Sequence, residues 1–275
     1  MSNIRSNSVK KVLDKLKTIA KDKDKYAHFY EHYGRLIKEG VYQDFEHKDN
    51  LTELLRYNST KDEGLVSLKE YVNRMKDDQK SIYYITGRNQ ISLRNSPLLE
   101  MYEKMDIEVL LLDDEIDEII IPSVPKYDEK ELKSINRSGA ADDFSEEKDK
   151  DKEKSLKPVL KKIKNILGER VKDVILSNRL SESPSCIVAD EHDPTAQMQE
   201  LMRSMGQTDL PEIKPILELN PNHKIIKRLK DKTRQKSFND IAFLLYEQAL
   251  IQEGVKLDNP AEFTERLNKV IINTL

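Results

Sequence analysis

The most constraining stretch of this chain runs from Ser81 to Glu118, because it predicts a buried strand, a helix and a second buried strand. Ile82–Ile85 is a short run of β-forming residues that Gly87 ends, and a helical pattern begins near Pro97. Val109–Leu112 is continuously apolar without alternation, which is typical of a parallel strand covered on both faces. The segment therefore predicts a small α/β unit, and such units often bind ligands at the carboxyl ends of their strands.

Length and composition bound the rest of the chain. With 275 residues it is long enough for two domains, and 35% charged residues with only eight glycines favour helix over turn-rich β structure. The formal net charge of −3 gives no field that would recruit nucleic acid or an anionic membrane. A single cysteine is typical of a reducing compartment. Without a secretory signal or an apolar run of about 20 residues, we expect a cytoplasmic protein.

Local patterns predict two domains of mixed α/β and α+β structure. Residues 1–138 form the first, helical over 1–60 and α/β over 61–138. Residues 139–154 are nearly free of apolar side chains, cannot bury enough surface to fold alone, and are expected to be a charged linker. Residues 155–275 form the second domain. Its expected strands cover 171–176, 185–188 and 215–219, and its expected helices cover 156–167, 195–205, 222–232, 238–252 and 261–274.

The acidic run after the second buried strand allows two interpretations. Asp113, Asp114 and Asp117 could hold Mg²⁺ for phosphoryl chemistry, since a hard cation prefers carboxylate oxygen. No P-loop, G-x-G-x-x-G motif or basic phosphate cradle accompanies them. A solvated acidic loop is favoured, and a Mg²⁺-dependent nucleotide or phosphoryl enzyme using Asp113–Asp117 is the alternative.

Two histidines and the single cysteine are the other candidates for chemistry. His28 and His32 are four residues apart on a predicted helix and could share a metal ion. The intervening residues do not form an H-E-x-x-H arrangement and no third ligand is evident, so we favour surface histidines and expect no metal. Cys186 lies in an apolar strand without a basic neighbour, which is typical of an inert core residue. No residue is predicted to be catalytic.

The helix predicted over 195–205 carries a complete apolar stripe at positions i, i+3, i+4 and i+7. Its members are Met198, Leu201, Met202 and Met205. Methionine repacks against varied partners, so adaptable binding surfaces use it. Periodicity alone does not separate such a surface from a core face, and the polar approach over 189–194 favours an exposed helix.

The last two helices predict a partner. Residues 241–246 are apolar on every face, so packing on one side cannot cover them. Burial within the same chain is the alternative, but a two-fold partner that completes a four-helix bundle is favoured. The expected homodimer interface consists of Ile241, Leu244, Leu245, Phe263, Leu267, Val270 and Ile271.

Several long segments resemble one family. EYVNRMKDDQKSIYYITG (70–87) and SPLLEMYEKMDIEVLLLDDEIDE (96–118) are similar to the middle domain of the heat-shock protein 90 chaperones. LGERVKDVILSNRLSESPSCIV (167–188) and LELNPNHKIIKRL (217–229) resemble that family's C-terminal domain, in its bacterial branch, the high-temperature protein G chaperones. Residues 9–40 match as well. The resemblance covers nearly the whole chain in order and is weakest in the charged linker.

The resemblance implies part of a dimeric, ATP-driven chaperone that remodels client proteins. It implies that the last two helices dimerise and that the stripe from Met198 to Met205 contacts clients. A second client contact would fall on Glu118 and Ile119, although members often carry tryptophan at the latter position and this chain contains none.

The resemblance also implies what to expect of catalysis. The family's N-terminal nucleotide-binding domain and the loop whose arginine reaches ATP have no counterpart in this sequence. We therefore expect a fragment, the later middle domain plus the C-terminal domain, that is not itself an enzyme and binds no cofactor. The full-length parent would be an ATPase that holds ATP and Mg²⁺ in its N-terminal domain. The expected partners are a second copy and client proteins, with neither nucleic acid nor membrane.

Overall fold

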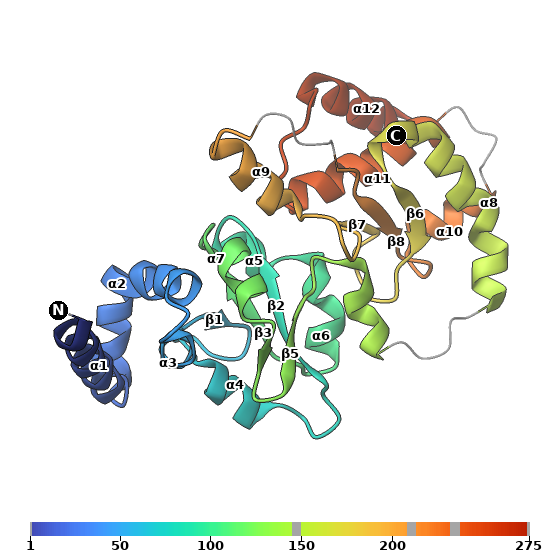
Figure 1. The fold of residues 1–275 in the computed structure, drawn as a ribbon. Coiled ribbons are helices and arrows are strands. Elements are labelled where there is room, and N and C mark those ends of the chain that lie inside the picture. The colour runs from blue at the N-terminus through green and yellow to red at the C-terminus, as the bar shows by residue number, and fades with distance from the viewer. Residues whose placement is uncertain (1, 145–149, 208–212, 232–236, 274–275) are drawn as a thin grey trace. The chain divides into compact units, whose positions relative to one another are not determined.

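A computed structural model describes residues 2–144, 150–207, 213–231 and 237–273 (Figure 1). The chain forms two compact units: unit 1 holds residues 1–86 and 107–133, and unit 2 holds residues 87–106 and 134–275. The expected mixed fold of helices and strands is confirmed. The division differs from a single boundary near residue 138, because residues 87–106 belong with the C-terminal unit.

Unit 1 is built on a five-stranded sheet with the order β1-β3-β2-β5-β4. Its parallel pair is the one that the sequence predicts, with Tyr84 of β2 opposite Leu110 of β3. The strands are β1 (Asn58–Ser59), β2 (Ser81–Thr86), β3 (Val109–Leu112), β4 (Lys126–Tyr127) and β5 (Lys130–Ser134). The helices are α1 (Ser2–Ile19), α2 (Lys23–Gln43), α3 (Lys48–Thr52), α4 (Leu68–Arg74) and α7 (Asp117–Ile120), followed by the 3-10 turn η2 (Ile121–Ser123).

Side-chain caps begin two helices of unit 1. The Ser67 hydroxyl accepts a hydrogen bond from the Glu70 amide, and the Glu70 carboxylate accepts one from the Ser67 amide, which completes a capping box at the start of α4. Asp22 caps α2 with a single bond, which its carboxylate accepts from the Lys25 amide. One face of α2 then buries Tyr26, Ile37 and Val41 in the core of unit 1.

Unit 2 contains a three-stranded sheet with the order β6-β8-β7. β8 pairs parallel with β6 and antiparallel with β7. The strands are β6 (Asp173–Leu176), β7 (Ser185–Val188) and β8 (Ile216–Leu219). The helices are α5 (Gln90–Arg94), α6 (Glu100–Lys104), α8 (Lys150–Leu167), α9 (Ala196–Ser204), α10 (Lys224–Asp231), α11 (Phe238–Gln252) and α12 (Pro260–Ile272), with 3-10 turns η1 (Pro97–Leu99), η3 (Ser138–Phe144) and η4 (Gly168–Arg170).

Both ends of the expected linker over 139–154 lie in regular structure. The 3-10 segment η3 buries Ala140 and Ala141, and α8 already begins at Lys150. Residues 145–149 lie outside the described ranges. The core of unit 2 takes Leu156, Val159 and Ile163 from one face of α8, so a helix anchored by that face extends upstream into a segment whose own composition predicts no structure. In the described ranges no helix is both long and apolar enough to cross a membrane.

Candidate interaction surfaces

Helix α9 presents its apolar stripe without burying it. The Thr195 hydroxyl accepts a hydrogen bond from the Met198 amide at 3.1 Å and so caps the helix. Within this fully described helix no side chain is buried: three members of the stripe are half-buried and Met205 is 65% exposed. An apolar stripe left this accessible is typical of a contact surface.

The opposite side of α9 lines a cavity of about 670 Å³ inside unit 2. Gln199, Glu200 and Arg203 face this cavity, together with Leu250 and Glu253 from the end of α11. At about 3.6 residues per turn, these α9 positions lie across the helix from the stripe. The stripe therefore points away from the cavity, and the polar side of α9 faces its own unit.

Polar contacts from Arg88 and Gln197 connect α9 to the rest of unit 2. The Arg88 guanidinium lies 2.6 Å from the Glu200 carboxylate, and both side chains are substantially exposed. Exposed ion pairs of this kind stabilise by about 1 kcal/mol or less. The Gln197 amide donates to the main-chain oxygen of Glu253 at 3.4 Å. These contacts connect α9 to Arg88 and to the end of α11.

The Glu253 carboxylate lies at the edge of the same cavity and has an unusual pKa. The Asn136 side chain donates to its carboxylate at 3.3 Å, and no lysine or arginine among the described residues forms an ion pair with it. Removal of the carboxylate from water raises the pKa of Glu253 to about 7. Its protonation therefore changes near neutral pH.

The predicted dimer interface is divided between core and surface. α11 buries Leu245, at 2% exposure, in the core of unit 2, whereas Ile241 and Leu244 are half-buried. α12, which is described in full, has no buried side chain. Leu267 and Ile271 are 39% and 46% exposed, and Phe263 and Val270 are half-buried. The accessible part of the predicted surface therefore lies mainly on α12, where Ile272, which sequence reasoning missed, is 70% exposed.

Arg266 connects α12 to α11. The Arg266 guanidinium lies 4.4 Å from the centroid of the Phe243 ring and forms ion pairs with Glu247 and Glu262. Stacking of a guanidinium on an aromatic face adds to its ion pairs. The two helices thus form a pair that presents an apolar stripe on α12.

The second predicted client contact is only partly accessible. Glu118 and Ile119 lie on α7, in unit 1, directly after the acidic run. Glu118 is 8% exposed, and Ile119 is half-buried. Of these two residues, Ile119 therefore offers more surface to a binding partner.

The acidic run contains a buried ammonium that sequence reasoning did not identify. Lys38 Nζ lies 2.9 Å from Asp117 Oδ2 and 3.3 Å from Asp114 Oδ2. Lys38 and Asp117 are 7% and 1% exposed. No sequence signal marks this pair, because Lys38 follows a helical pattern 79 residues before Asp117. The ammonium already contacts two of the carboxylates that a Mg²⁺ ion would need, which counts against the enzyme interpretation.

Burial raises the pKa of Asp117 to about 6, and the Lys38 ammonium opposes that shift. Among the described residues, Asp117 Oδ1 and the hydroxyl oxygens of Tyr30 and Tyr57 are buried without a hydrogen-bond partner. Buried polar atoms without partners destabilise a fold. These three unsatisfied atoms therefore lower the stability of the core of unit 1.

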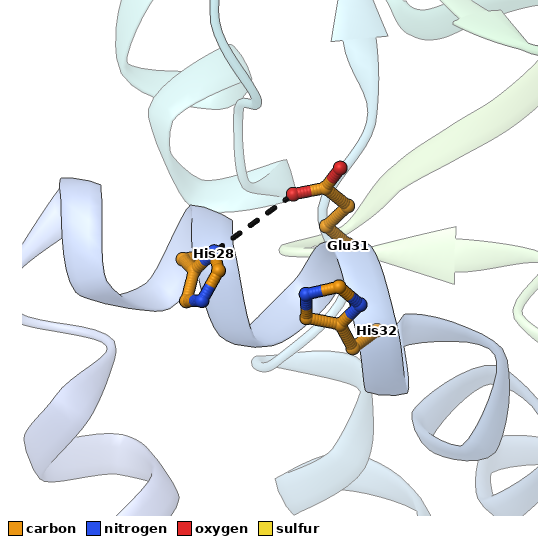
Figure 2. A group of neighbouring side chains, drawn as sticks. All are labelled: His28, Glu31 and His32. Atoms are coloured by element: carbon orange, nitrogen blue, oxygen red, sulfur yellow. Dashed lines mark ion pairs between the residues drawn. The ribbon is translucent and has the colours of Figure 1, made fainter.

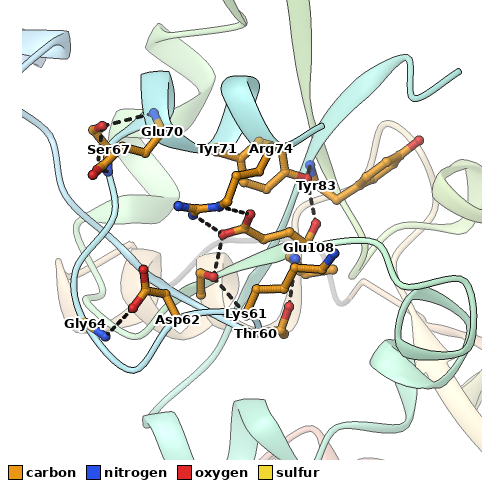
Figure 3. A network of polar contacts seen from close by, with 12 residues as sticks. Thr60, Lys61, Asp62, Gly64, Ser67, Glu70, Tyr71, Arg74, Tyr83 and Glu108 are labelled. Carbon is orange, nitrogen blue, oxygen red and sulfur yellow. Dashed lines mark hydrogen bonds and ion pairs between the residues drawn. The ribbon is translucent and has the colours of Figure 1, made fainter. Parts of the chain in front are cut away.

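A second buried carboxylate, that of Glu108, lies directly before strand β3, whereas the acidic run follows that strand. Figure 3 shows Glu108, which accepts hydrogen bonds from Arg74 Nε at 2.9 Å and from Arg74 Nη2 at 2.7 Å. The Ser59 hydroxyl donates to the same carboxylate, and the Tyr71 hydroxyl donates to the Glu108 main-chain oxygen at 2.6 Å. A bidentate arginine pair of this kind is geometrically specific. The network fixes α4 and β1 against the start of β3 and carries no open ligand position.

In unit 2, Arg179 has the corresponding structural role. It is 1% exposed and donates to the Glu218 carboxylate at 3.2 Å and to the main-chain oxygen of Ile135 at 2.6 Å. Cys186, beside the same carboxylate, is 2% exposed, and burial raises the pKa of its thiol well above the usual value. A thiol held neutral is a poor nucleophile.

Comparison with known proteins identifies the family of this chain. A family model described as Hsp90 protein matches residues 1–275. The chain is 47% identical to the chaperone protein HtpG of Treponema denticola, over 99% of this chain and 44% of that protein. It is 45% identical to HtpG of Aliarcobacter butzleri and 42% identical to HtpG of Legionella pneumophila, in each case over 100% of this chain and 44% or 45% of the relative. The chain spans less than half the length of these relatives, and it belongs to the Hsp90 family, in the branch that contains the bacterial HtpG proteins.

Proposed function

We propose that this chain is the dimerisation and client-contact part of an HtpG-type chaperone. The observation that carries the proposal is the presence, in one unit, of two amphipathic helices without a buried side chain, α9 and α12. A helix with an apolar stripe gains most of its stability by packing that stripe against something. The relatives are named as chaperones, whose substrates are other proteins.

Helix α12 suits a permanent partner. Its stripe includes Leu267, Ile271 and Ile272, and α11 beside it supplies the half-buried Ile241 and Leu244. Two such helices form half of a four-helix bundle, which a two-fold axis completes with the same surface from a second copy. Leu245 supports the interface from within the core rather than by direct contact.

Helix α9 suits transient partners. Three of its four stripe residues are methionines, whose flexible thioether side chains adapt to differently shaped apolar surfaces. Its weak attachment through Arg88 and Gln197 allows the helix to adjust to a client. In the dimer, two copies of this surface would act on the same client, which raises the effective concentration of the contact.

The dimer proposal is tested with charge in the α12 stripe. In the double variant Leu267→Asp, Ile271→Asp, two carboxylates would have to be buried at the interface, so we expect a monomer by light scattering at micromolar concentration. Asn268→Asp adds a carboxylate beside the stripe and is the matched control, expected to remain dimeric. A double variant that keeps the mass of a dimer would contradict the proposed interface.

The client-contact proposal is tested with Met198→Ser and Met202→Ser together. We expect roughly fivefold weaker binding of a permanently unfolded, reduced and alkylated protein, because apolar contact area is lost. The melting temperature should change by no more than a few degrees, since neither side chain is buried. Gln199→Ser, on the cavity side of α9, serves as the control. A large fall in melting temperature with unchanged client binding would assign the stripe to the core instead.

A further inference from the structure

One turn of α2 brings three potential metal ligands together on the surface of unit 1. Figure 2 shows His28, Glu31 and His32 on the same side of the helix. One donor atom from each residue lies within 4.8 Å of the other two. His28 Nδ1 is 3.9 Å from Glu31 Oε2, and the two imidazole rings lie edge to face with their centroids 5.0 Å apart. Glu31 is the third ligand that the sequence pattern did not reveal, because it precedes the second histidine rather than following the first.

We propose that His28, Glu31 and His32 bind one divalent transition-metal ion of the Zn²⁺ or Ni²⁺ type. Two imidazole nitrogens and one carboxylate oxygen suit these ions, whereas Mg²⁺ and Ca²⁺ require oxygen ligands throughout. Three protein ligands leave coordination positions open. Water, or a donor from another molecule, completes the coordination shell.

The helix positions the ligands before any ion arrives. The buried face of the same turns is held in the core of unit 1 by Tyr26, Tyr30 and Ile37. Residues at i, i+3 and i+4 share one face of a helix, so rotation about side-chain bonds alone is sufficient to converge the three donors. No backbone ordering is needed, which removes a large part of the entropic cost of binding.

The three side chains are also accessible and not engaged by stronger partners. The side chains of His28 and Glu31 are 78% and 73% exposed. Within the described part of the chain, Glu31 forms its only ion pair with His28. Arg35, one turn later, lies 3.5 Å from Glu39 instead, and Lys25 lies 2.6 Å from Asp22. The nearby cations are therefore neutralised by other carboxylates.

The rest of the described chain offers a contrast. No other group of three or more histidine, cysteine or acidic side chains in the described ranges has converging donor atoms. His47 is the nearest comparison, with its Nδ1 3.0 Å from an Asp44 carboxylate oxygen but no second imidazole beside it. A single imidazole with one carboxylate is a poorer chelate. His47 therefore provides an internal control.

Calorimetric titration of the whole chain with Zn²⁺, and separately with Ni²⁺, at pH 7.5 tests the proposal. We expect one ion per chain. His28→Gln and His32→Gln should each weaken binding roughly tenfold or more, since even groups outside the ligand shell change metal affinity 10- to 100-fold. Glu31→Gln should weaken it less, and His47→Gln should leave it unchanged.

Thermal melting tests the same site without relying on the heats of the calorimetric titration. Saturating Zn²⁺ should raise the melting temperature of the wild type and of His47→Gln, but not of His28→Gln. Circular dichroism of the His28, Glu31 and His32 variants should match the wild type, because these three side chains are exposed. Equal Zn²⁺ affinity in His28→Gln, His32→Gln and the wild type would overturn the site, as would an equal loss in His47→Gln. Neither result bears on the proposed dimer or client surfaces.

Discussion

Among the residues that the structure describes, each unit buries one cationic side chain, and the two side chains act differently. In unit 1, Lys38 places a single ammonium between Asp114 and Asp117 and leaves Asp117 Oδ1 without a partner among the described residues. In unit 2, Arg179 donates to both carboxylate oxygens of Glu218 and to the main-chain oxygens of Ile135, Arg137 and Ser138. The lysine neutralises charge, whereas the arginine also satisfies backbone groups.

The difference follows from the chemistry of the two side chains. An ammonium is a compact point charge, whereas a guanidinium presents five donors in a planar fork. Arg179 can therefore fasten the segment from Ile135 to Ser138 to strand β8, and it contributes to the inclusion of that segment in unit 2. Lys38 joins α2 to the acidic run through two carboxylates. We expect removal of the arginine to cost more than removal of the lysine.

The largest expected effect is that of Arg179→Met. The substitution leaves Glu218 charged and buried and removes the donor of three main-chain carbonyl groups, so the free energy of unfolding should fall by about 4–5 kcal/mol. Urea denaturation followed by circular dichroism measures it. Arg179→Lys should recover little of the loss, because one ammonium cannot reach all of these acceptors. Arg203→Met, at an exposed position on α9, is the matched control and should change stability by less than about 0.5 kcal/mol. If Arg179→Lys had the full stability of the wild type, the proposed difference between the buried arginine and the buried lysine would be wrong.

A smaller, pH-dependent effect is expected of Lys38→Met. At pH 7.5 the variant should lose about 3 kcal/mol, because the buried Asp117 must either stay charged without its ammonium or take up a proton on folding. The pKa of Asp117 is already raised to about 6 in the wild type. Below that pH the carboxylate takes a proton, so the difference between variant and wild type should shrink toward pH 5. Urea unfolding at the two pH values checks this, and a penalty that does not change with pH would show that Asp117 stays charged.

The smallest effect is expected of Glu253→Gln, which replaces a desolvated carboxylate without a salt-bridge partner. Burial raises the pKa of Glu253 to about 7, above its usual value of 4.5. The folded state therefore holds a proton that the unfolded state releases, and this stabilisation is full below pH 4.5 and is lost as pH rises through 7. The variant should match the wild type at pH 5 and exceed it by up to about 2 kcal/mol at pH 8. Thermal melts at both pH values measure the difference, and a variant less stable at pH 8 would contradict it.

Sequence periodicity predicted the elements well because burial repeats at fixed spacing. The strand predicted over 185–188 and the helix predicted over 238–252 have the observed bounds of β7 and α11. The parallel pairing of β2 with β3 also followed from an apolar run without alternation. Ser67 and Asn259 cap the starts of α4 and α12.

Contacts between distant residues could not be predicted in this manner. α11 is apolar all round, so its pattern did not separate Leu245, which is buried in the core, from Leu244, which is half-buried. The cations Lys38 and Arg179 lie in ordinary polar contexts, and their partners are 79 and 39 residues away. The third potential metal ligand, Glu31, directly precedes His32 in the sequence. The H-E-x-x-H motif instead places its glutamate directly after the first histidine.

The path of the chain between the units has a consequence for experimental dissection. It passes from one unit to the other three times, after residues 86, 106 and 133, so a single proteolytic cut cannot release either unit intact. A recombinant piece beginning at residue 139 would lack Glu100, whose carboxylate accepts hydrogen bonds from the Ser181, Glu182 and Ser183 amides. It would also lack Arg88, the ion-pair partner of α9. Unit 2 is a discontinuous domain, and its independent expression requires residues 87–106 to be supplied by fusion or circular permutation.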